Sequence, residues 1–295
     1  MLPSSPAPRT WFITGASRGI GHALAVAALE RGDRVVAAAR TASTDLFDAR
    51  HRDRVLALSV DVTDKDAVDA AVATAVEHVG RLDVVVNNAG TMSMGMVEEF
   101  TEAQARAQLE VNFFGALWVT QAVLPHLRRQ GSGHVLQISS IAALGGFPST
   151  GMYSASKFAL EGLSEALAME AAAFGVKVTV VQPGGYWTDL YTSMTATTPA
   201  DAYGPLRAEL ERQWADGSVD SDPRLAAEAM LTVVDSDDPP LRLALGSMTY
   251  DLAHHVSQQR VETWAAWEQV SRAAEHAVAQ PDAAQDPGRH RRGGR

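Results

Sequence analysis

Tyr153 and Lys157 are the residues of this sequence whose types and spacing most directly suggest acid–base chemistry. They stand four positions apart in an apolar-periodic segment, so on a helix their side chains share one face and can meet. A free tyrosine has a pKa of about 10, and serving as a base near neutrality requires a shift of roughly 3 units, or about 4 kcal/mol in favour of the phenolate. A neighbouring ammonium group in a partly desolvated site can supply that stabilisation. We therefore expect Tyr153 to exchange a proton with a substrate and Lys157 to be its charge partner.

A second group of residues is typical of a site for a phosphate-containing ligand. The first apolar run leads into Thr14-Gly15-Ala16-Ser17-Arg18-Gly19-Ile20-Gly21, which opens directly into a helical segment. Glycines at such a turn permit a tight bend and a close approach of backbone to a pyrophosphate, while the helix N-terminus offers unpaired N–H groups to the anion. Because strand, glycines and helix occur in the required order, we predict a dinucleotide site here in preference to an ordinary turn.

The end of the second predicted strand indicates which dinucleotide is bound. In NAD-binding units an acidic residue at this place accepts hydrogen bonds from the adenosine ribose. This sequence has Ala39 followed by Arg40, so no carboxylate would repel a 2′-phosphate. Arg40 and Arg18 can clamp such a phosphate by charge-assisted hydrogen bonds. We expect NADP (NADPH/NADP+) as the cofactor, the alternative being that both arginines are plain surface residues.

The elements that must position these residues alternate between short β-branched runs and alanine-rich segments of helical period. Near-continuous apolar runs such as Val84-Val85-Val86 indicate strands that are buried on both faces. The seven strand candidates are residues 10–14, 34–39, 55–60, 84–87, 134–139, 177–182 and 241–245. The helix candidates are residues 19–31, 64–79, 102–129, 152–174, 224–234 and 248–279.

This alternation predicts an α/β fold, with a single doubly wound (Rossmann-type) domain over residues 10–280 and a seven-stranded parallel sheet covered by helices on both faces. Residues 185–222 break the alternation and are expected to form a long loop that acts as a lid. Residues 1–9 are expected to be a flexible arm and residues 281–295 a disordered tail. The helix at 248–279 would pad the core or a subunit interface with Trp264 and Trp267, and His254 and His255 would lie on its surface.

Composition narrows the possible partners. The chain has 295 residues and a formal net charge of -10, which gives no support for binding nucleic acid or an anionic membrane surface. There is no cysteine, so disulfides, zinc–thiolate sites and a thiol nucleophile are excluded. No stretch reaches the ~18 apolar residues of a membrane span, and the N-terminal residues do not form a secretory signal. We expect a soluble, cytoplasmic protein without a metal.

Further motifs follow the glycine turn in a fixed order, and together they make the chain resemble the short-chain dehydrogenase/reductase family over residues 10 to 190. The Tyr-x-x-x-Lys and glycine motifs are the most specific of them. The motifs are Asp61-Val62, Asn87-Asn88-Ala89-Gly90, Asn112, Ser139-Ser140, Tyr153-Ser154-Ala155-Ser156-Lys157 and Pro183-Gly184.

The resemblance implies a role for each matching residue. Asp61 and Val62 would border the adenine, Asn88, Ala89 and Gly90 would lie against the ribose next to the nicotinamide, and Asn87 would be structural. Pro183, Gly184 and Thr188 would hold the carboxamide, and Lys157 would also bind the ribose. In the oxidised complex the positive nicotinamide ring would help the Lys157 ammonium group to stabilise the Tyr153 phenolate. Ser140, at the family's spacing of 13 residues before Tyr153, would hydrogen-bond the substrate oxygen, with Ser139 pointing elsewhere. Asn112 would hold a water in a proton relay behind Lys157. A homodimer or homotetramer is the usual assembly of the family.

The function implied is an NADP(H)-dependent oxidoreductase that moves hydride between the nicotinamide and a carbonyl or alcohol group of a small molecule. Two alternatives remain open: a non-catalytic dinucleotide-binding sensor or regulator on the same fold, and sugar-nucleotide epimerase or dehydratase chemistry. Eight large side chains are expected to face the pocket and to favour an apolar substrate. They are Met92, Met94, Met96, Phe147, Tyr186, Trp187, Tyr191 and Met194.

Overall fold

The computed structural model of the chain describes residues 8–217 and 220–275, and it divides the chain into two compact units at Ala253. The first unit holds the sheet and every predicted site residue, and the second begins at His254. The first seven residues of the predicted arm, the predicted tail at 281–295 and the predicted boundary at residue 280 lie outside the described residues.

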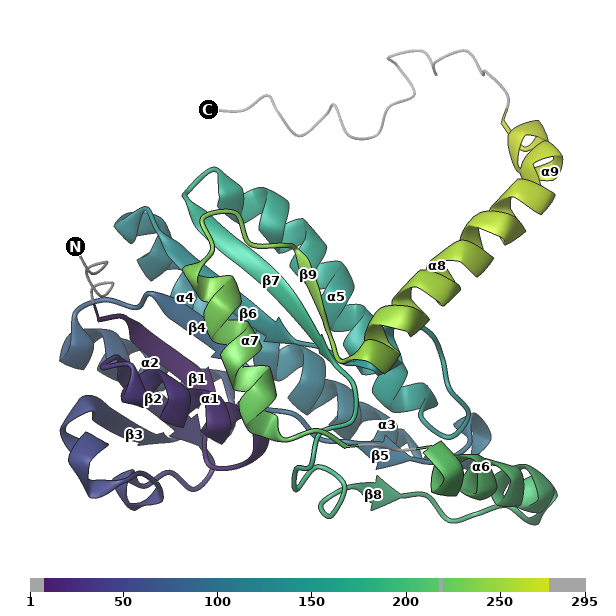
Figure 1. The fold of residues 1–295 in the computed structure, drawn as a ribbon, viewed down its shortest axis with the longest axis horizontal. Coiled ribbons are helices and arrows are strands. Elements are labelled where there is room, and N and C mark those ends of the chain that lie inside the picture. The colour runs from purple at the N-terminus through teal and green to yellow at the C-terminus, as the bar shows by residue number, and fades with distance from the viewer. Residues whose placement is uncertain (1–7, 218–219, 276–295) are drawn as a thin grey trace, which may run out of the picture. The chain divides into compact units, whose positions relative to one another are not determined.

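A seven-stranded parallel sheet forms the centre of the first unit, as predicted (Figure 1). The strand order is β3-β2-β1-β4-β6-β7-β9, so the chain builds outward from β1 and then returns to β4 beside it. This reversal creates a crevice at the carboxyl ends of β1 and β4, where α/β sheets bind ligands. The strands are β1 (Thr10–Thr14), β2 (Arg34–Ala39), β3 (Val55–Ser59), β4 (Val84–Asn87), β6 (Gly133–Ile138), β7 (Val176–Pro183) and β9 (Arg242–Leu245).

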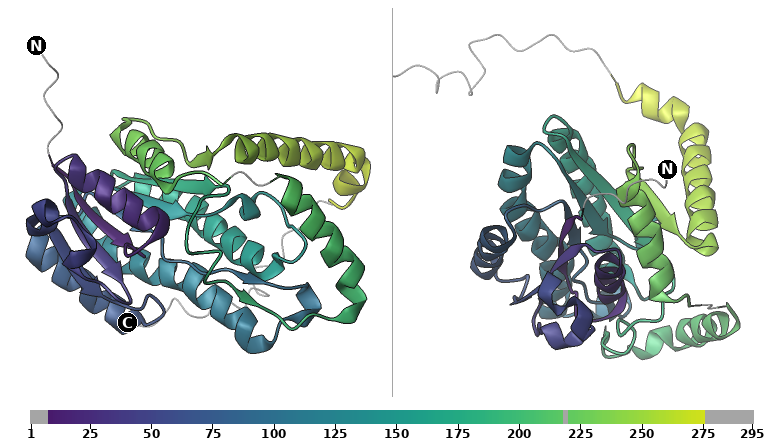
Figure 2. Two further views of the ribbon diagram at one scale, coloured as in Figure 1. Left: turned by 60° about the horizontal axis from the view of Figure 1, so that its bottom comes forward. Right: turned by 60° about the vertical axis from the view of Figure 1, so that its left-hand side comes forward.

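Helices cover both faces of the sheet because successive strand residues point to opposite faces and almost all of them are apolar (Figure 2). Trp11 and Ile13 belong to the core beneath α1 (Gly19–Glu30) and α7 (Pro223–Asp235), which pack against each other. Phe12 lies between them in β1 and belongs to the opposite core, beneath α2 (Lys65–Val79), α4 (Gly115–Gln130) and α5 (Gly151–Ala172).

The helix predicted at residues 102–129 is interrupted. It consists of α3 (Glu102–Leu109), a π-helical turn at Glu110–Phe114 and α4. A π-helical turn widens the backbone locally, and such turns are frequent at functional sites. Asn112, a polar residue that interrupts the apolar pattern of this helix, lies in the π-helical turn, but the pattern does not show the change of hydrogen bonding.

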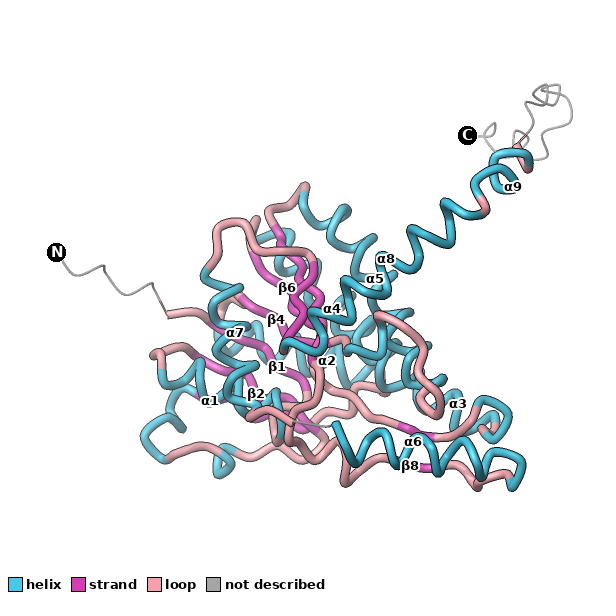
Figure 3. Tube along the Cα trace, turned by 45° about the vertical axis from the view of Figure 1, so that its right-hand side comes forward, coloured by secondary structure: helices cyan, strands magenta, loops and turns pink. Residues whose placement is uncertain are grey.

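The predicted lid at residues 185–222 is more ordered than a long loop. It contains β8 (Thr195–Ala196), a short 3-10 turn (Asp201–Tyr203) and α6 (Gly204–Gly217), and Figure 3 shows α6 following β8 along this segment. Strand β8 pairs in parallel with β5 (Ser93–Met94), a strand that the sequence did not predict. The expectation of a plain loop is therefore wrong, and the lid is tied to the segment that follows β4.

The last described helices are α8 (Ser247–Ala266) and α9 (Glu268–Ala273). Trp264 is 67% exposed and Trp267 is 62% exposed, so the prediction that they pad the core is wrong, and their place in a subunit interface stays a prediction. Among the described helices, none combines the length and the apolar character that crossing a membrane requires.

Candidate active site

A cleft of about 1120 Å³ opens at the carboxyl ends of the parallel strands. Most of the predicted site residues line it, although they come from motifs spread over more than half of the chain. Of the predicted catalytic residues, Ser140, Tyr153 and Lys157 line the cleft and Asn112 does not. The predicted cofactor-binding residues that line it are Gly15, Ser17, Arg18, Gly19, Ile20, Arg40, Asp61, Val62, Asn88, Ala89, Gly90, Tyr153, Lys157, Pro183, Gly184 and Thr188.

The glycine turn after β1 has the backbone geometry that a phosphate cradle needs. Gly15 and Gly19 adopt positive φ angles of 66° and 58°, which side chains rarely tolerate. Helix α1 begins at Gly19 without a side-chain cap, so its first N–H groups remain available to an anion. Gly21 does not line the cleft; a Cβ there would lie 2.3 Å from Asn88 Nδ2, so this glycine serves close packing.

Asn88 braces this turn, a role that the sequence did not reveal. Its Nδ2 donates hydrogen bonds to the carbonyl oxygens of Thr14 at 2.9 Å and Gly15 at 3.2 Å. In return, Thr14 Oγ1 accepts bonds from the backbone N–H groups of Asn88 and Ala89, both at 3.0 Å. These hydrogen bonds join the ends of β1 and β4 where the two halves of the sheet meet.

Asn87 is structural, as the resemblance implied, since its buried Nδ2 donates to Thr120 Oγ1 and Gln137 Oε1.

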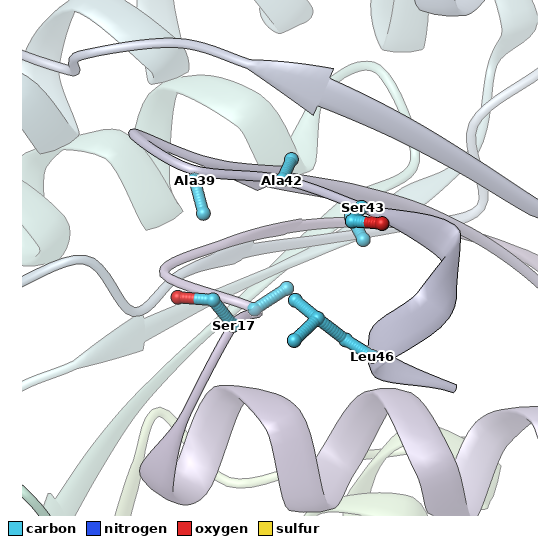
Figure 4. A pocket seen from close by; sticks show the side chains of 7 residues that line it. Ser17, Ala39, Ala42, Ser43 and Leu46 are labelled. Atoms are coloured by element: carbon cyan, nitrogen blue, oxygen red, sulfur yellow. The ribbon is translucent and has the colours of Figure 1, made fainter. Parts of the chain in front are cut away.

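The end of β2 forms a small recess beside the glycine turn (Figure 4). Its lining contains no carboxylate and consists of Ala16, Ser17, Ala37, Ala39, Ala42, Ser43 and Leu46. Arg40 lines the neighbouring cleft and helps to lower the pKa of Asp61. Arg18 also lines the cleft and donates a 3.3 Å hydrogen bond to Ser193 Oγ of the lid. Two guanidinium groups therefore lie at this end of the cleft, together with the Asp61 carboxylate, whereas the recess itself is lined by neutral side chains.

Asp61 terminates β3 by capping the following turn. Its carboxylate accepts hydrogen bonds from the backbone N–H and the hydroxyl of Thr63, at 3.0 Å and 2.8 Å. The backbone hydrogen bond is the main reason why the pKa of Asp61 is below its usual value. The carboxylate is thus fixed as an anion at the edge of the cleft, next to Val62.

Helix α5 places Tyr153 and Lys157 on one face, and both side chains are buried. Lys157 Nζ lies 5.9 Å from the centre of the Tyr153 ring and donates a 2.8 Å hydrogen bond to the carbonyl oxygen of Ile138. Ser140 follows β6 and faces the same cleft, and its Oγ accepts a bond from Ala142 N at 3.1 Å. The predicted proton-transfer group is therefore assembled from the end of one strand and the start of one helix.

In the chain alone, burial governs the protonation states of Tyr153 and Lys157. Burial raises the pKa of Tyr153, and the Ser140 hydroxyl beside the phenol only partly opposes this. Burial also lowers the pKa of Lys157 to about 8, against the opposing charge of Glu161. The expected lowering of the Tyr153 pKa relies on the Lys157 ammonium group together with the positive nicotinamide ring of the oxidised complex, and it stays a prediction. A buried neutral phenol is a proton donor near neutrality, which suits protonation of a substrate oxygen.

Asn112 lies in the π-helical turn and is almost completely buried. Its Nδ2 donates to Thr91 O and Ser156 Oγ, each at 3.0 Å, and its Oδ1 accepts from Thr91 N at 2.9 Å. A Cβ at Gly90 would lie 3.5 Å from Asn112 Oδ1 and 3.7 Å from Lys157 Nζ. The side chain of Asn112 therefore holds the segment behind Lys157 in place, and its part in a proton relay stays a prediction.

Two buried carboxylates hold hydrogen-bond networks that sequence reasoning missed. Glu161 accepts hydrogen bonds from Ser139 Oγ at 2.6 Å and from Gln182 Nε2 at 2.9 Å, and Ser139 also lines the cleft, so its expected orientation away from the substrate stays a prediction. Glu99, whose side chain is 1% exposed, accepts bonds from Thr197 Oγ1 at 2.7 Å and Ala200 N at 2.8 Å and pairs with Arg207. Their partners stand far away in the sequence, so no local pattern could indicate either network.

The predicted apolar pocket lining is largely wrong. Of the eight large side chains expected there, only Tyr186 and Tyr191 line the cleft. Met96 is buried at the turn that Glu99 closes, whereas Trp187 is 71% exposed. An apolar residue in a loop can face the core, the cleft or solvent, and sequence periodicity does not distinguish the three.

Comparison with known proteins agrees with this geometry. The family model for short chain dehydrogenase matches residues 9–199. The chain belongs to this family. A crystal structure of a short-chain dehydrogenase from Streptomyces avermitilis is 40% identical, superposes with a TM-score of 0.82, and covers 92% of this chain and 100% of its own.

Two other members are similar over most of their length. A 3-ketodihydrosphingosine reductase from Bacteroides thetaiotaomicron is 36% identical over 248 residues, 82% of this chain and 89% of that protein. A short chain dehydrogenase from Burkholderia cenocepacia in complex with NADP is 27% identical, with a TM-score of 0.69 and coverage of 88% and 96%. This chain is thus a short-chain dehydrogenase, an oxidoreductase with the Rossmann-type fold predicted from its sequence.

Proposed function

We propose that this short-chain dehydrogenase is an NADP(H)-dependent oxidoreductase that transfers hydride between the nicotinamide and a carbonyl or alcohol group. One observation carries the proposal: Ser140, Tyr153 and Lys157 converge on the same cleft whose other end is the glycine turn. A homodimeric or homotetrameric assembly and a cytoplasmic location are part of this proposal.

The residues around the cleft fit a phosphorylated dinucleotide. The positive-φ glycines and the uncapped start of α1 would hold the pyrophosphate. Arg18 and Arg40 would hold a 2′-phosphate, and the neighbouring recess at the end of β2 has no carboxylate to repel it. The NADP complex of the related Burkholderia dehydrogenase supports the same choice of cofactor. When bound, the cofactor supplies or accepts the hydride.

The chain's own side chains handle the proton and the substrate oxygen. The Ser140 hydroxyl would donate a hydrogen bond to the carbonyl oxygen and orient it toward Tyr153. Because burial raises the pKa of Tyr153, the phenol keeps its proton near neutrality and can give it to that oxygen during reduction. The Lys157 ammonium group then stabilises the phenolate that remains. Oxidation of an alcohol would use the same groups in reverse, and the reductase name of the Bacteroides relative agrees with a ketone substrate.

Turnover of a ketone and aldehyde panel with NADPH, followed at the nicotinamide absorbance, tests the proposal. Tyr153→Phe removes only the hydroxyl, and we expect it to lower kcat by at least about a hundredfold and to leave NADPH binding nearly unchanged. Tyr203→Phe, at a tyrosine of the lid segment outside the cleft lining, is the matched control and should keep wild-type turnover. NADPH binding without turnover of any carbonyl would favour the sensor alternative instead.

A further inference from the structure

Four large apolar side chains near the end of the described chain are exposed to solvent. Val261, Trp264, Trp267 and Val270 are each between 53% and 67% exposed. They follow one another at intervals of three residues along α8 and α9, and we call them the apolar row. The row lies in the second unit, and none of its members belongs to the motifs of the proposed site.

The helical path continues through the row. Trp267 lies between α8 and α9, and its backbone N–H still donates to Thr263 O at 3.3 Å. Ser271 N in turn donates to Trp267 O at 3.0 Å. Residues three apart on a helix are neighbours on its surface, so the four side chains form one strip. A strip with this spacing runs obliquely to the helix axis.

The helix that carries the row has no buried residue in this part of the chain. All residues from 257 to 275 are exposed. A helix in water depends mostly on the packing of an apolar face, and this face has nothing packed on it. Exposed ion pairs such as Arg272 with Glu268 contribute little to stability. The row therefore needs a covering surface from another molecule.

The size of the row suits one half of a small protein interface. Covering two tryptophans and two valines of this exposure removes roughly 500 Å² from solvent on each copy. A symmetric pair thus buries roughly 1000 Å² in total, which is about the minimum for a specific interface. The charges do not favour a lipid surface, because residues 257–275 hold two arginines and three glutamates, whereas helices that lie on membranes are rich in lysine and arginine.

The order of residues in the row points to a second copy of the chain as the covering surface. The sequence Val-x-x-Trp-x-x-Trp-x-x-Val reads the same in both directions. In a two-fold interface every contact occurs twice, with residue i against residue j and residue j against residue i. An antiparallel pair sets Trp264 against the partner's Trp267 and Val261 against the partner's Val270. Aromatic rings thus meet aromatic rings, and valine meets valine.

We propose that the apolar row is a self-association surface through which two copies of the chain pair antiparallel about a two-fold axis between Trp264 and Trp267. Because each row runs obliquely, the two helices cross, and the tryptophans meet at the crossing point. The stacked rings add to the free energy gained from the buried area. The pairing is reversible and depends on protein concentration, since the buried area is small. It adds one two-fold contact to any assembly that the first unit forms.

Sedimentation velocity of the full chain over a range of concentrations measures the pairing. At high concentration the wild type should have twice the mass of Trp264→Gln/Trp267→Gln, because the double substitution should weaken association by roughly a hundredfold or more. Trp187→Gln is the matched control: it replaces a similarly exposed tryptophan outside the row and should keep the wild-type mass. A cooperative thermal unfolding transition like that of the wild type shows that the first unit of each variant stays folded.

Charge substitutions at the two valines test the antiparallel register. Val261→Lys and Val270→Glu should each weaken self-association, because a charge is then placed opposite an apolar side chain. Mixing these two variants should restore the pairing, since the new ammonium group of one chain faces the new carboxylate of the other. Mixing Val261→Lys with Val261→Glu should not restore it, because the two changed positions then lie at opposite ends of the crossing.

An equal mass for the wild type and Trp264→Gln/Trp267→Gln at every concentration would overturn the inference. Rescue by Val261→Lys with Val261→Glu, in place of Val261→Lys with Val270→Glu, would also overturn it. Binding to phosphatidylglycerol vesicles that the double tryptophan variant loses, without a change in mass, would assign the row to a lipid surface instead. Because no substrate is present, the result is independent of the proposed reaction: pairing through the row without turnover of any carbonyl would contradict the proposed function alone.

Discussion

The buried ammonium group of Lys157 destabilises the folded chain near neutral pH, and the structure gives the size of the effect. Burial lowers the pKa of Lys157 from 10.5 to about 8, even with the opposing charge of Glu161. One pKa unit between the folded and unfolded states corresponds to about 1.4 kcal/mol, so the whole shift corresponds to about 3 kcal/mol of stability.

The sign follows from which state holds the proton more tightly. The unfolded chain keeps the Lys157 proton up to pH 10.5, whereas the folded chain loses it near pH 8. The free energy of unfolding therefore rises with pH between about 8 and 10.5. The stability gained when the folded chain no longer buries a charged lysine is fully present above pH 10.5 and is lost as the pH falls through about 8. Between about pH 7 and about pH 10 we expect a gain of about 2.5 kcal/mol from this one group.

Lys157→Met removes the titrating group and keeps an unbranched side chain. Loss of the hydrogen bond to Ile138 O shifts the variant's stability by a constant of about 1–3 kcal/mol and adds no pH dependence. The stability difference between wild type and variant should therefore change by about 2.5 kcal/mol in favour of wild type across that pH range. The other titrating groups cancel in the difference.

Urea unfolding followed by tryptophan fluorescence, at several pH values from about 7 to about 10, measures this difference. Lys177→Met removes an exposed lysine on β7 and is the matched control, which should run parallel to wild type. If the difference between wild type and Lys157→Met stays constant within about 0.5 kcal/mol, the buried ammonium carries no such cost and the reasoning is wrong.

Two further predictions concern the cofactor and the lid. Arg40→Ala should lower kcat/KM for NADPH by roughly tenfold to a hundredfold, because a charge-assisted hydrogen bond to a phosphate is lost. The value of kcat/KM for NADH should stay nearly unchanged. An equal loss with both cofactors in steady-state assays would contradict the phosphate role. Glu99→Gln should raise the protease sensitivity of residues 195–207, because its hydrogen bonds lower the pKa of Glu99 from 4.5 to about 2 and hold the lid. The stability contributed by Glu99 is present above pH 4.5 and lost as the pH falls toward about 2, so acid unfolding curves of wild type and variant should converge there.

The fold was predictable because its signals are local. Each strand of the sheet is a short β-branched run, and the parallel register follows from the helices between them. Most residues predicted for the cofactor line the cleft for a similar reason, since Gly15 and Gly19 lie in one turn and Arg40 directly follows β2. The helix predicted at residues 102–129 is present, but the apolar period could not show its π-helical turn around Asn112.

The internal structure of the segment at residues 185–222 could not be predicted, because its contacts join segments about a hundred residues apart. Thr197 and Ala200 bind Glu99, and a Cβ at Gly95 would lie 2.2 Å from Thr197 Oγ1. Each partner alone is an ordinary loop residue. The predicted apolar lining failed because loop residues can face the core, the cleft or solvent, whereas Ser140, Tyr153 and Lys157 do line the cleft and their catalytic roles stay a prediction.

The chemistry of the site depends both on the local spacing of residues in the sequence and on contacts between segments that are distant in the sequence. The spacing of Tyr153 and Lys157 on α5 brings the two side chains together, and the sequence shows this. Their protonation states depend on burial and on Glu161, whose carboxylate is held by Ser139 from the end of β6 and by Gln182 from β7. Burial leaves Tyr153 an acid, so the chain alone is prepared to protonate a carbonyl oxygen. Under the proposed function, oxidation of an alcohol would need the phenolate, which the positive nicotinamide ring would help the Lys157 ammonium group to stabilise, as expected from the sequence.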